Sequence, residues 1–151
     1  MVFAASFLLI FAPAAALAGP AGKSSELSLL GAMNAARAAH GLGPLHFDAA
    51  LERAAHAHSA DMLRRNYFAH GSFGGRMLAF HVKGPTAGEN LAWGTGPYGR
   101  AATIVQEWLA SPEHRANLLR PGYSRVGLGI VQGSFQGAGG ATVVTADFAG
   151  R

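Results

Sequence analysis

The chain has 151 residues, a formal net charge of +4 and no cysteine, and half of its residues are hydrophobic. This length fits one compact domain, and the composition supports a hydrophobic core. The absence of cysteine excludes disulfides, thiolate zinc ligands and a cysteine nucleophile. The arginines are scattered and form no basic stripe with interleaved aromatic residues, so nucleic acid is not an expected partner.

The chain begins with an uncharged apolar segment, VFAASFLLIFAPAAALA, at residues 2–18. It ends in the small-residue pattern Ala-Leu-Ala, which predicts a signal peptide over residues 1–18 and export to the periplasm or the extracellular space. The segment lacks the usual Lys or Arg before its apolar run, and an uncleaved membrane anchor is the alternative. No later segment is apolar enough to span a bilayer, so we expect no stable transmembrane span after processing.

Two helices are predicted in the first half of the mature chain. Residues 19–25 are typical of a flexible leader, and a first helix follows over residues 26–39 with Ser25 as its N-cap. A second helix begins after Asp48 and extends to about residue 66. Its apolar positions recur at helical spacing and predict a buried face formed by Leu51, Ala54, Ala55, His58 and Met62.

The second half of the chain moves from helices to strands. Residues 67–88 are rich in glycine, with a short helix expected over residues 76–82, and the segment ENLAW is a strand candidate. A third helix is predicted over residues 98–110, and Pro112 suits the first position of a new helical turn. Two strands, SRVGLGIVQG and ATVVTADFA, predict a hairpin joined by the loop SFQGAGG. Helices come first and strands last, so the expected fold class is α+β.

Four side chains bear the chemistry of greatest interest: His70, Glu89, Glu107 and His114. Two imidazoles and two carboxylates are the minimum set for a divalent metal site with an acid/base pair beside it. No pair among them has a metal-motif spacing such as H-x-x-x-H, and each residue taken alone is more simply a solvated surface group. Local sequence leaves both interpretations open.

Taken together, the segments that carry these residues resemble one family. They are DMLRRNYFAHGS, GRMLAF, GENLAWG, EWLASPEHRANLL, YSRVGLGI and TADFAG, in the order found in bacterial members of the CAP superfamily. This superfamily unites cysteine-rich secretory proteins, antigen 5 and plant pathogenesis-related proteins, and its domain is also called the SCP domain. The resemblance covers residues 27–149 and implies a CAP/SCP domain over residues 26–151. The implied fold is a three-layer α-β-α sandwich with a small, mostly antiparallel sheet.

The resemblance also implies a His-Glu-Glu-His tetrad in a central cleft, whose roles fall on His70, Glu89, Glu107 and His114. In some family members the two histidines bind a divalent ion such as zinc, so His70 and His114 are the expected metal ligands. The two glutamates would orient the imidazoles or a bound water, or act as general base. Two protein ligands, where zinc hydrolases have three, argue for modest affinity and against a strongly catalytic site.

The function expected from these residues is that of an exported CAP/SCP-domain binding protein. Its cleft would hold a divalent metal, a small molecule, a lipid or another component of the cell envelope. One alternative is a metal-assisted, peptidase-like hydrolase with Glu89 or Glu107 as general base to a metal-bound water. A further alternative is a non-catalytic interaction domain of the cell envelope.

Two other features have simpler interpretations. The segment GTGPYG at residues 94–99 matches the dinucleotide fingerprint G-x-G-x-x-G. Pro97 removes one N–H from the would-be phosphate cradle, and the chain lacks a parallel-sheet pattern, so a turn that leads into the next helix is favoured. His58 lies on the buried face of the second predicted helix, and we expect a hydrogen-bonded core or boundary histidine there.

Overall fold

The computed structural model describes residues 20–151, with side chains from residue 22, and confirms the α+β class. The predicted signal peptide, residues 1–18, lies outside the described residues. The helices are α1 (Pro20–Ala39), α2 (Ala49–Arg65), α3 (Phe73–Ala79), the 3-10 helix η1 (Gly96–Gly99), α4 (Ala101–Ala110) and α5 (Pro112–Leu118). The strands are β1 (His46–Phe47), β2 (Ala87–Thr95), β3 (Tyr123–Phe135) and β4 (Ala138–Gly150).

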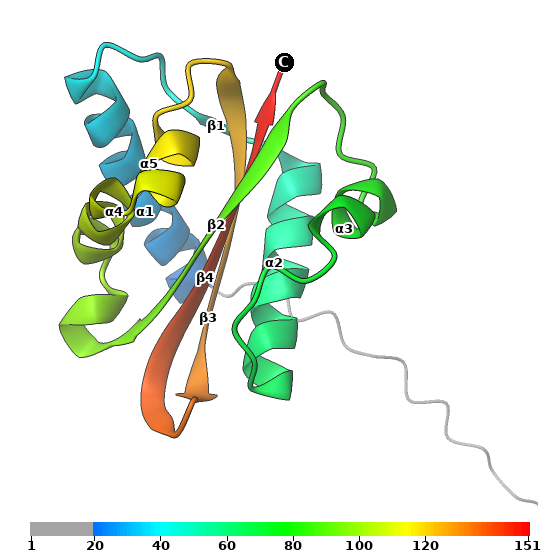
Figure 1. The fold of residues 1–151 in the computed structure, drawn as a ribbon. Helices are drawn as coiled ribbons and strands as arrows, with labels where there is room; N and C mark the ends of the chain where they lie inside the picture. Colours follow the sequence, from blue (N-terminus) through cyan, green and yellow to red (C-terminus); the bar gives the residue numbers. More distant parts are fainter. Residues whose placement is uncertain (1–19) are drawn as a thin grey trace, which may run out of the picture.

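The elements form the expected three-layer sandwich. The sheet has the strand order β1-β3-β4-β2, with β1 parallel to β3 and the other pairs antiparallel. Helices α2 and α3 cover one face of the sheet, and α1, α4 and α5 cover the other (Figure 1). No helix within residues 20–151 is long and apolar enough to cross a membrane.

Helix α2 follows the sequence prediction closely. Asp48 is its N-cap, and one carboxylate oxygen accepts from the backbone N–H groups of Ala50 at 2.9 Å and Leu51 at 3.1 Å. All five residues of the predicted apolar face are buried. The cap and the apolar spacing are local signals, and here they agree with the final packing.

Helix α1 begins at Pro20, so residues 20–25 are helical and the prediction of a flexible leader is wrong for them. Proline suits the first turn of a helix, because its missing N–H would have no partner there. Lys23 then fastens this turn to α2 by donating to the carboxylate of Glu52. Ser25 is consequently an interior helix residue and not the predicted N-cap.

The hairpin of β3 and β4 is longer and its turn is tighter than predicted. Most of the predicted loop SFQGAGG belongs to the two strands, and only Gln136 and Gly137 connect them. Both residues have positive φ, 51° and 81°, which is the conformation of a type I′ turn. Three further differences are modest. Helix α3 starts earlier than expected, and α4 starts at Ala101, after the separate 3-10 helix η1, and not at residue 98. The short strand β1 was not predicted.

Two glycines of β3 allow helix α2 to lie directly on the sheet. A Cβ at Gly127 would lie 1.9 Å from the carbonyl carbon of Leu51, and one at Gly129 would lie 2.3 Å from that of Ala55. No side chain fits in that space, so the backbones of α2 and β3 approach closely. This packing fixes the first half of α2 against the sheet.

Candidate functional site

Helix α5 is fastened to the edge strand β2 by side-chain amides. Asn90 donates to the carbonyl of His114 at 2.9 Å. Asn117 donates to the carbonyl of Glu89 at 3.0 Å and to the amide oxygen of Asn90 at 3.1 Å. Asn90 is fully buried, whereas Asn117 and His114 are half-buried, so these bonds lie at the boundary of the core. They hold together the two elements that carry Glu89 and His114, which are two of the four predicted site residues.

His70 and Glu89 are in direct contact. The Nδ1 of His70 lies 2.6 Å from the Oε1 of Glu89. The Glu89 side chain is only 2% exposed, whereas that of His70 is 57% exposed. A carboxylate that binds one ring nitrogen fixes the orientation and tautomer of an imidazole and leaves the other nitrogen for a ligand. Here the bond occupies Nδ1 and leaves Nε2 of His70.

A buried arginine and a second buried acid complete the surroundings of Glu89, and sequence reasoning did not assign them a role. Arg76 of α3 donates to Oε2 of Glu89, and its guanidinium lies 3.8 Å from Oδ1 of Asp147 on β4. Asp147 has no exposed surface, and within residues 20–151 neither of its oxygens has a hydrogen-bond partner. The segments GRMLAF and TADFAG contain both residues, but no local pattern shows that they meet Glu89.

Burial raises the pKa values of both buried acids. Burial raises the pKa of Glu89 to about 7, although the nearby charge of Arg76 acts in the opposite direction. Burial, and then the negative charge of Glu89, raise the pKa of Asp147 to about 8. Asp147 is therefore a neutral acid at neutral pH, and the single positive charge of Arg76 is shared mainly with Glu89.

His58 is the buried, hydrogen-bonded histidine that the sequence predicts. Its Nε2 lies 3.0 Å from the carbonyl oxygen of Ala69, and the residue is 4% exposed. Burial lowers its pKa to about 4, so the ring is neutral and donates from Nε2. The same nitrogen lies 3.8 Å from Glu89, which gives the buried carboxylate a further polar neighbour.

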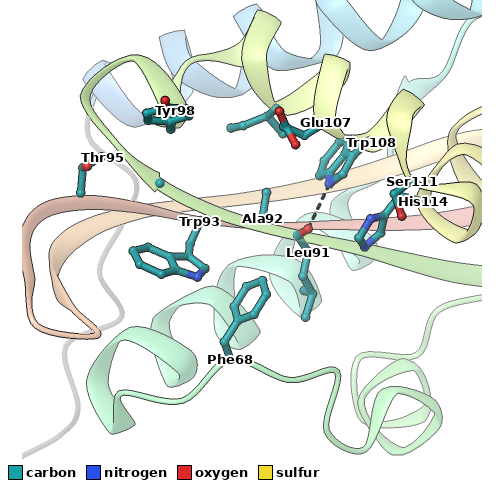
Figure 2. Close-up of a pocket in the computed structure, with 12 residues that line it drawn as sticks. Phe68, Leu91, Ala92, Trp93, Thr95, Tyr98, Glu107, Trp108, Ser111 and His114 are labelled. Atoms are coloured by element: carbon teal, nitrogen blue, oxygen red, sulfur yellow. Dashed lines mark hydrogen bonds between the residues drawn. The ribbon is translucent and has the colours of Figure 1, made fainter.

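Glu107 and His114 line a cleft of about 620 Å³ that follows β2. Figure 2 shows Phe68 and Trp93 on one side of this strand and Glu107 and Trp108 on the other. The indole of Trp108 donates to the carbonyl of Leu91 at 3.0 Å and so joins α4 to β2. The remaining apolar lining includes Leu91, Tyr98 and Ile104.

The structure thus brings the predicted residues together as two pairs around β2. His70 contacts Glu89, and Glu107 and His114 share the cleft. Burial, and then the charge of His70, lower the pKa of His114. Among residues 20–151, no group of three or more His, Asp or Glu side chains is arranged to hold a metal ion. A metal here would rely on two histidines.

The segment at residues 94–99 is a turn and not a nucleotide-binding loop. Gly94 and Thr95 end β2, and the next four residues form η1, which leads into α4. Strand β2 is antiparallel to its neighbour, whereas the dinucleotide fingerprint requires a parallel βαβ unit. The simpler of the two sequence interpretations is confirmed.

Comparison with known sequences identifies one family. The model of the CAP, or cysteine-rich secretory protein, family matches residues 30–148. Two similar proteins come from Bacillus subtilis (strain 168): the uncharacterized protein YkwD, 38% identical over 104 residues, and the uncharacterized membrane protein YlbC, 37% identical over 112 residues. The matches cover 66% and 71% of this chain but only 39% and 32% of those relatives. The chain therefore spans less than half the length of either protein.

Solved structures agree with this assignment. An extracellular SCP-domain protein from Bacillus anthracis str. Ames has a TM-score of 0.72 at 27% identity, covering 86% of this chain and 41% of that one. An outer surface protein from Borrelia burgdorferi has a TM-score of 0.70 at 20% identity, covering 85% and 95%. A cysteine-rich secretory protein from Staphylococcus aureus has a TM-score of 0.67 at 22% identity, covering 87% and 40%. The last two show likeness of fold alone. With a family model that matches most of its length, this cysteine-free chain belongs to the CAP family.

Proposed function

We propose that this CAP domain is an exported binding module whose cleft along β2 holds a divalent metal, with zinc the best match, and a small ligand from the cell envelope or its surroundings. The observation that supports this most directly is the contact between His70 and Glu89 at 2.6 Å. It is the arrangement in which a buried carboxylate orients a metal-binding imidazole.

The available donors fit a weakly held zinc ion. His70 keeps Nε2 for a ligand, and the lowered pKa of His114 favours the neutral ring that metal binding requires. Imidazole nitrogen suits zinc, and a bound zinc would supply a Lewis acid with open positions. Glu107 lines the same cleft and would orient water or a ligand there. Two protein ligands imply modest affinity that is lost as the histidines gain protons.

Three observations support export. The uncharged segment at residues 2–18 has the pattern of a signal peptide. Two structurally similar proteins are described as an extracellular protein and an outer surface protein. The overall charge of +4 suits a location near an anionic envelope.

Calorimetric titration of Zn²⁺ tests the metal site, using wild-type protein, His70→Ala and His114→Ala. His46→Ala is the matched control, since this exposed histidine lies on β1, away from the cleft. We expect His70→Ala and His114→Ala to lose the heat of binding while the control retains it, with circular dichroism confirming that all three variants are folded. Binding that survives in both His70→Ala and His114→Ala would remove the metal from the proposal.

A metal-assisted hydrolase is the second candidate, and the position of Glu107 favours it. This carboxylate is exposed in the cleft that His114 also lines, as a general base must be. Glu89 suits that role less, because it is buried and both of its oxygens are engaged by His70 and Arg76. Hydrolysis of peptide and ester panels should disappear in Glu107→Gln. Activity that is unchanged in this variant would exclude Glu107 as the base.

A further inference from the structure

We infer that the cleft accepts an extended peptide segment of alternating apolar and cationic residues, which adds to the open edge of β2 as a further strand. This inference rests on the proposed binding function and names the class of ligand for the same cleft. Three features support it: the backbone geometry of β2, the aromatic wall of the cleft and the negative charge of Glu107 on the opposite wall.

The backbone of β2 is paired on one side only. The strand lies at the end of the sheet order and pairs with β4 over all nine of its residues without a bulge. In a regular antiparallel ladder, each residue directs its N–H and C=O to the same side, and successive residues alternate between the two sides. Every second residue of β2 therefore faces away from β4.

Two side-chain contacts identify which residues face outward. The carbonyls of Glu89 and Leu91 accept hydrogen bonds from Asn117 of α5 and Trp108 of α4, neither of which lies on β4. Trp93 follows at the same spacing, so its N–H and C=O also face outward. Within residues 20–151, no side chain bonds to the Trp93 backbone. The edge is thus covered at Leu91 and open at Trp93, where the strand lines the cleft.

One wall of the cleft is apolar and aromatic. Phe68 and Trp93 are 42% and 38% exposed, which is high for large apolar side chains. Their rings pack edge-on against Phe135, with centroids 6.4 Å and 5.3 Å away. This contact holds both side chains on the α2 side of the strand, as Figure 2 shows from the open edge. Alternate residues of an added strand would lie against them.

The opposite wall carries a negative charge among apolar and polar side chains. Glu107 is the only Asp, Glu, Lys or Arg among the described residues that line the cleft, although the chain as a whole has an excess of positive charge. It lies with Tyr98 and Ser111 on the α4 side of β2. Residues of the added strand that point to this side are therefore expected to be Lys or Arg.

An extended peptide uses these features as a lipid tail does not. A tail would contact the aromatic wall but has no group to pair with the N–H and C=O of Trp93. Strand addition draws affinity from main-chain hydrogen bonds and specificity from alternate side-chain pockets. Open, exposed edges are otherwise protected in natural sheets, because they invite pairing with other chains.

The test begins with selection of a randomised library of linear peptides on the immobilised wild-type protein. We expect enriched peptides with alternating apolar and basic residues, and Glu107→Gln should weaken their binding. Trp93→Pro removes the outward N–H without removing a bond to β4, and Trp93→Ala is its matched control because it removes the same side chain but keeps the N–H. Trp93→Pro should weaken binding by about tenfold more than Trp93→Ala, the effect of one lost hydrogen bond.

A second measurement does not depend on how Trp93→Pro folds. Every second backbone amide of an enriched peptide can be N-methylated in two ways, on the odd or on the even residues. Methylation of the set whose N–H groups face β2 should abolish binding, and methylation of the other set should leave binding intact. Failure to enrich any binding peptide, or equal binding by both methylated forms, would overturn the inference. Zinc titration of the wild-type protein is independent: zinc binding with no enriched peptide overturns this inference alone, and peptide binding with no zinc binding overturns only the metal proposal.

Discussion

Asn117 and Asn90 are joined by a hydrogen bond of 3.1 Å that fastens helix α5 to the edge strand β2. Each amide also bonds to backbone at the site: Asn117 to the carbonyl of Glu89, and Asn90 to the carbonyl of His114. The segments GENLAWG and EWLASPEHRANLL thus act as one structural unit. The two amides hold the backbone of α5 at His114 against β2.

Asn90→Ala should lower the free energy of unfolding by about 1–3 kcal/mol, because it leaves the carbonyl of His114 and the amide of Asn117 without their buried partner. Urea denaturation followed by circular dichroism measures the change. Gln106→Ala, at an exposed position of α4, is the control. A loss no greater than that of the control would show that the two amides do not hold α5 in place.

Arg76→Met should lower the free energy of unfolding at pH 8 by about 3 kcal/mol, because Glu89 and Asp147 would then be buried without a cation. The loss should be smaller at pH 5, below the raised pKa values of both acids, where both are neutral. Urea denaturation at the two pH values measures this difference. Arg64→Met, at a side chain that is 71% exposed, should change little at either pH. An equal loss at both pH values would contradict the assigned charge pairing.

Asp147→Asn should flatten the dependence of stability on pH. The pKa of this carboxyl is about 8 in the folded chain and near 3.8 when unfolded, so between these values only the folded chain keeps the proton. The contribution of Asp147 to the free energy of unfolding is then greatest below the unfolded pKa. It falls as pH rises toward the folded pKa, by up to about 1.4 kcal/mol per pH unit. Thermal melts from pH 5 to pH 8 should show a shallower decline for Asp147→Asn than for wild type. Parallel declines would mean that Asp147 is already ionised in the native state.

Gly129→Ala should destabilise the fold by about 3 kcal/mol or more, because its Cβ would lie 2.3 Å from the backbone of Ala55 and force α2 away from the sheet. Gly139→Ala is the matched control on the partner strand, where a Cβ meets nothing within 4 Å. Chemical denaturation compares the two. Similar midpoints for both variants would contradict the close approach of α2 to β3.

Local sequence signals predicted those parts of the fold that depend on neighbouring residues. The Asp48 cap and the apolar spacing of α2 are complete within one helix, and both are confirmed. The start of α1 was missed because its first turn is held by Lys23 and Glu52, which are far apart in sequence. The tight turn at Gln136 was missed because a run of small residues does not mark where strand pairing ends.

The candidate site also combines residues that the sequence identifies with residues that only the folded chain brings together. Resemblance to the CAP family identified the tetrad His70, Glu89, Glu107 and His114. The structure places these residues around β2, while metal binding by the two histidines stays a prediction. The contribution of Arg76 and Asp147 was not predicted. These two residues meet Glu89 only when α3, β2 and β4 come together, and each looks like an ordinary charged residue within its own segment.

The central claim is that His70 and His114 act together as ligands of one metal ion beside β2, and imidazole nitrogen NMR during titration with Zn²⁺ tests it most directly. The account predicts that the ring ¹⁵N signals of His70 and His114 shift together at the same zinc concentration, with the change at Nε2 of His70, while His58 does not respond. Shifts confined to other histidines, with both of these rings unchanged, would contradict it.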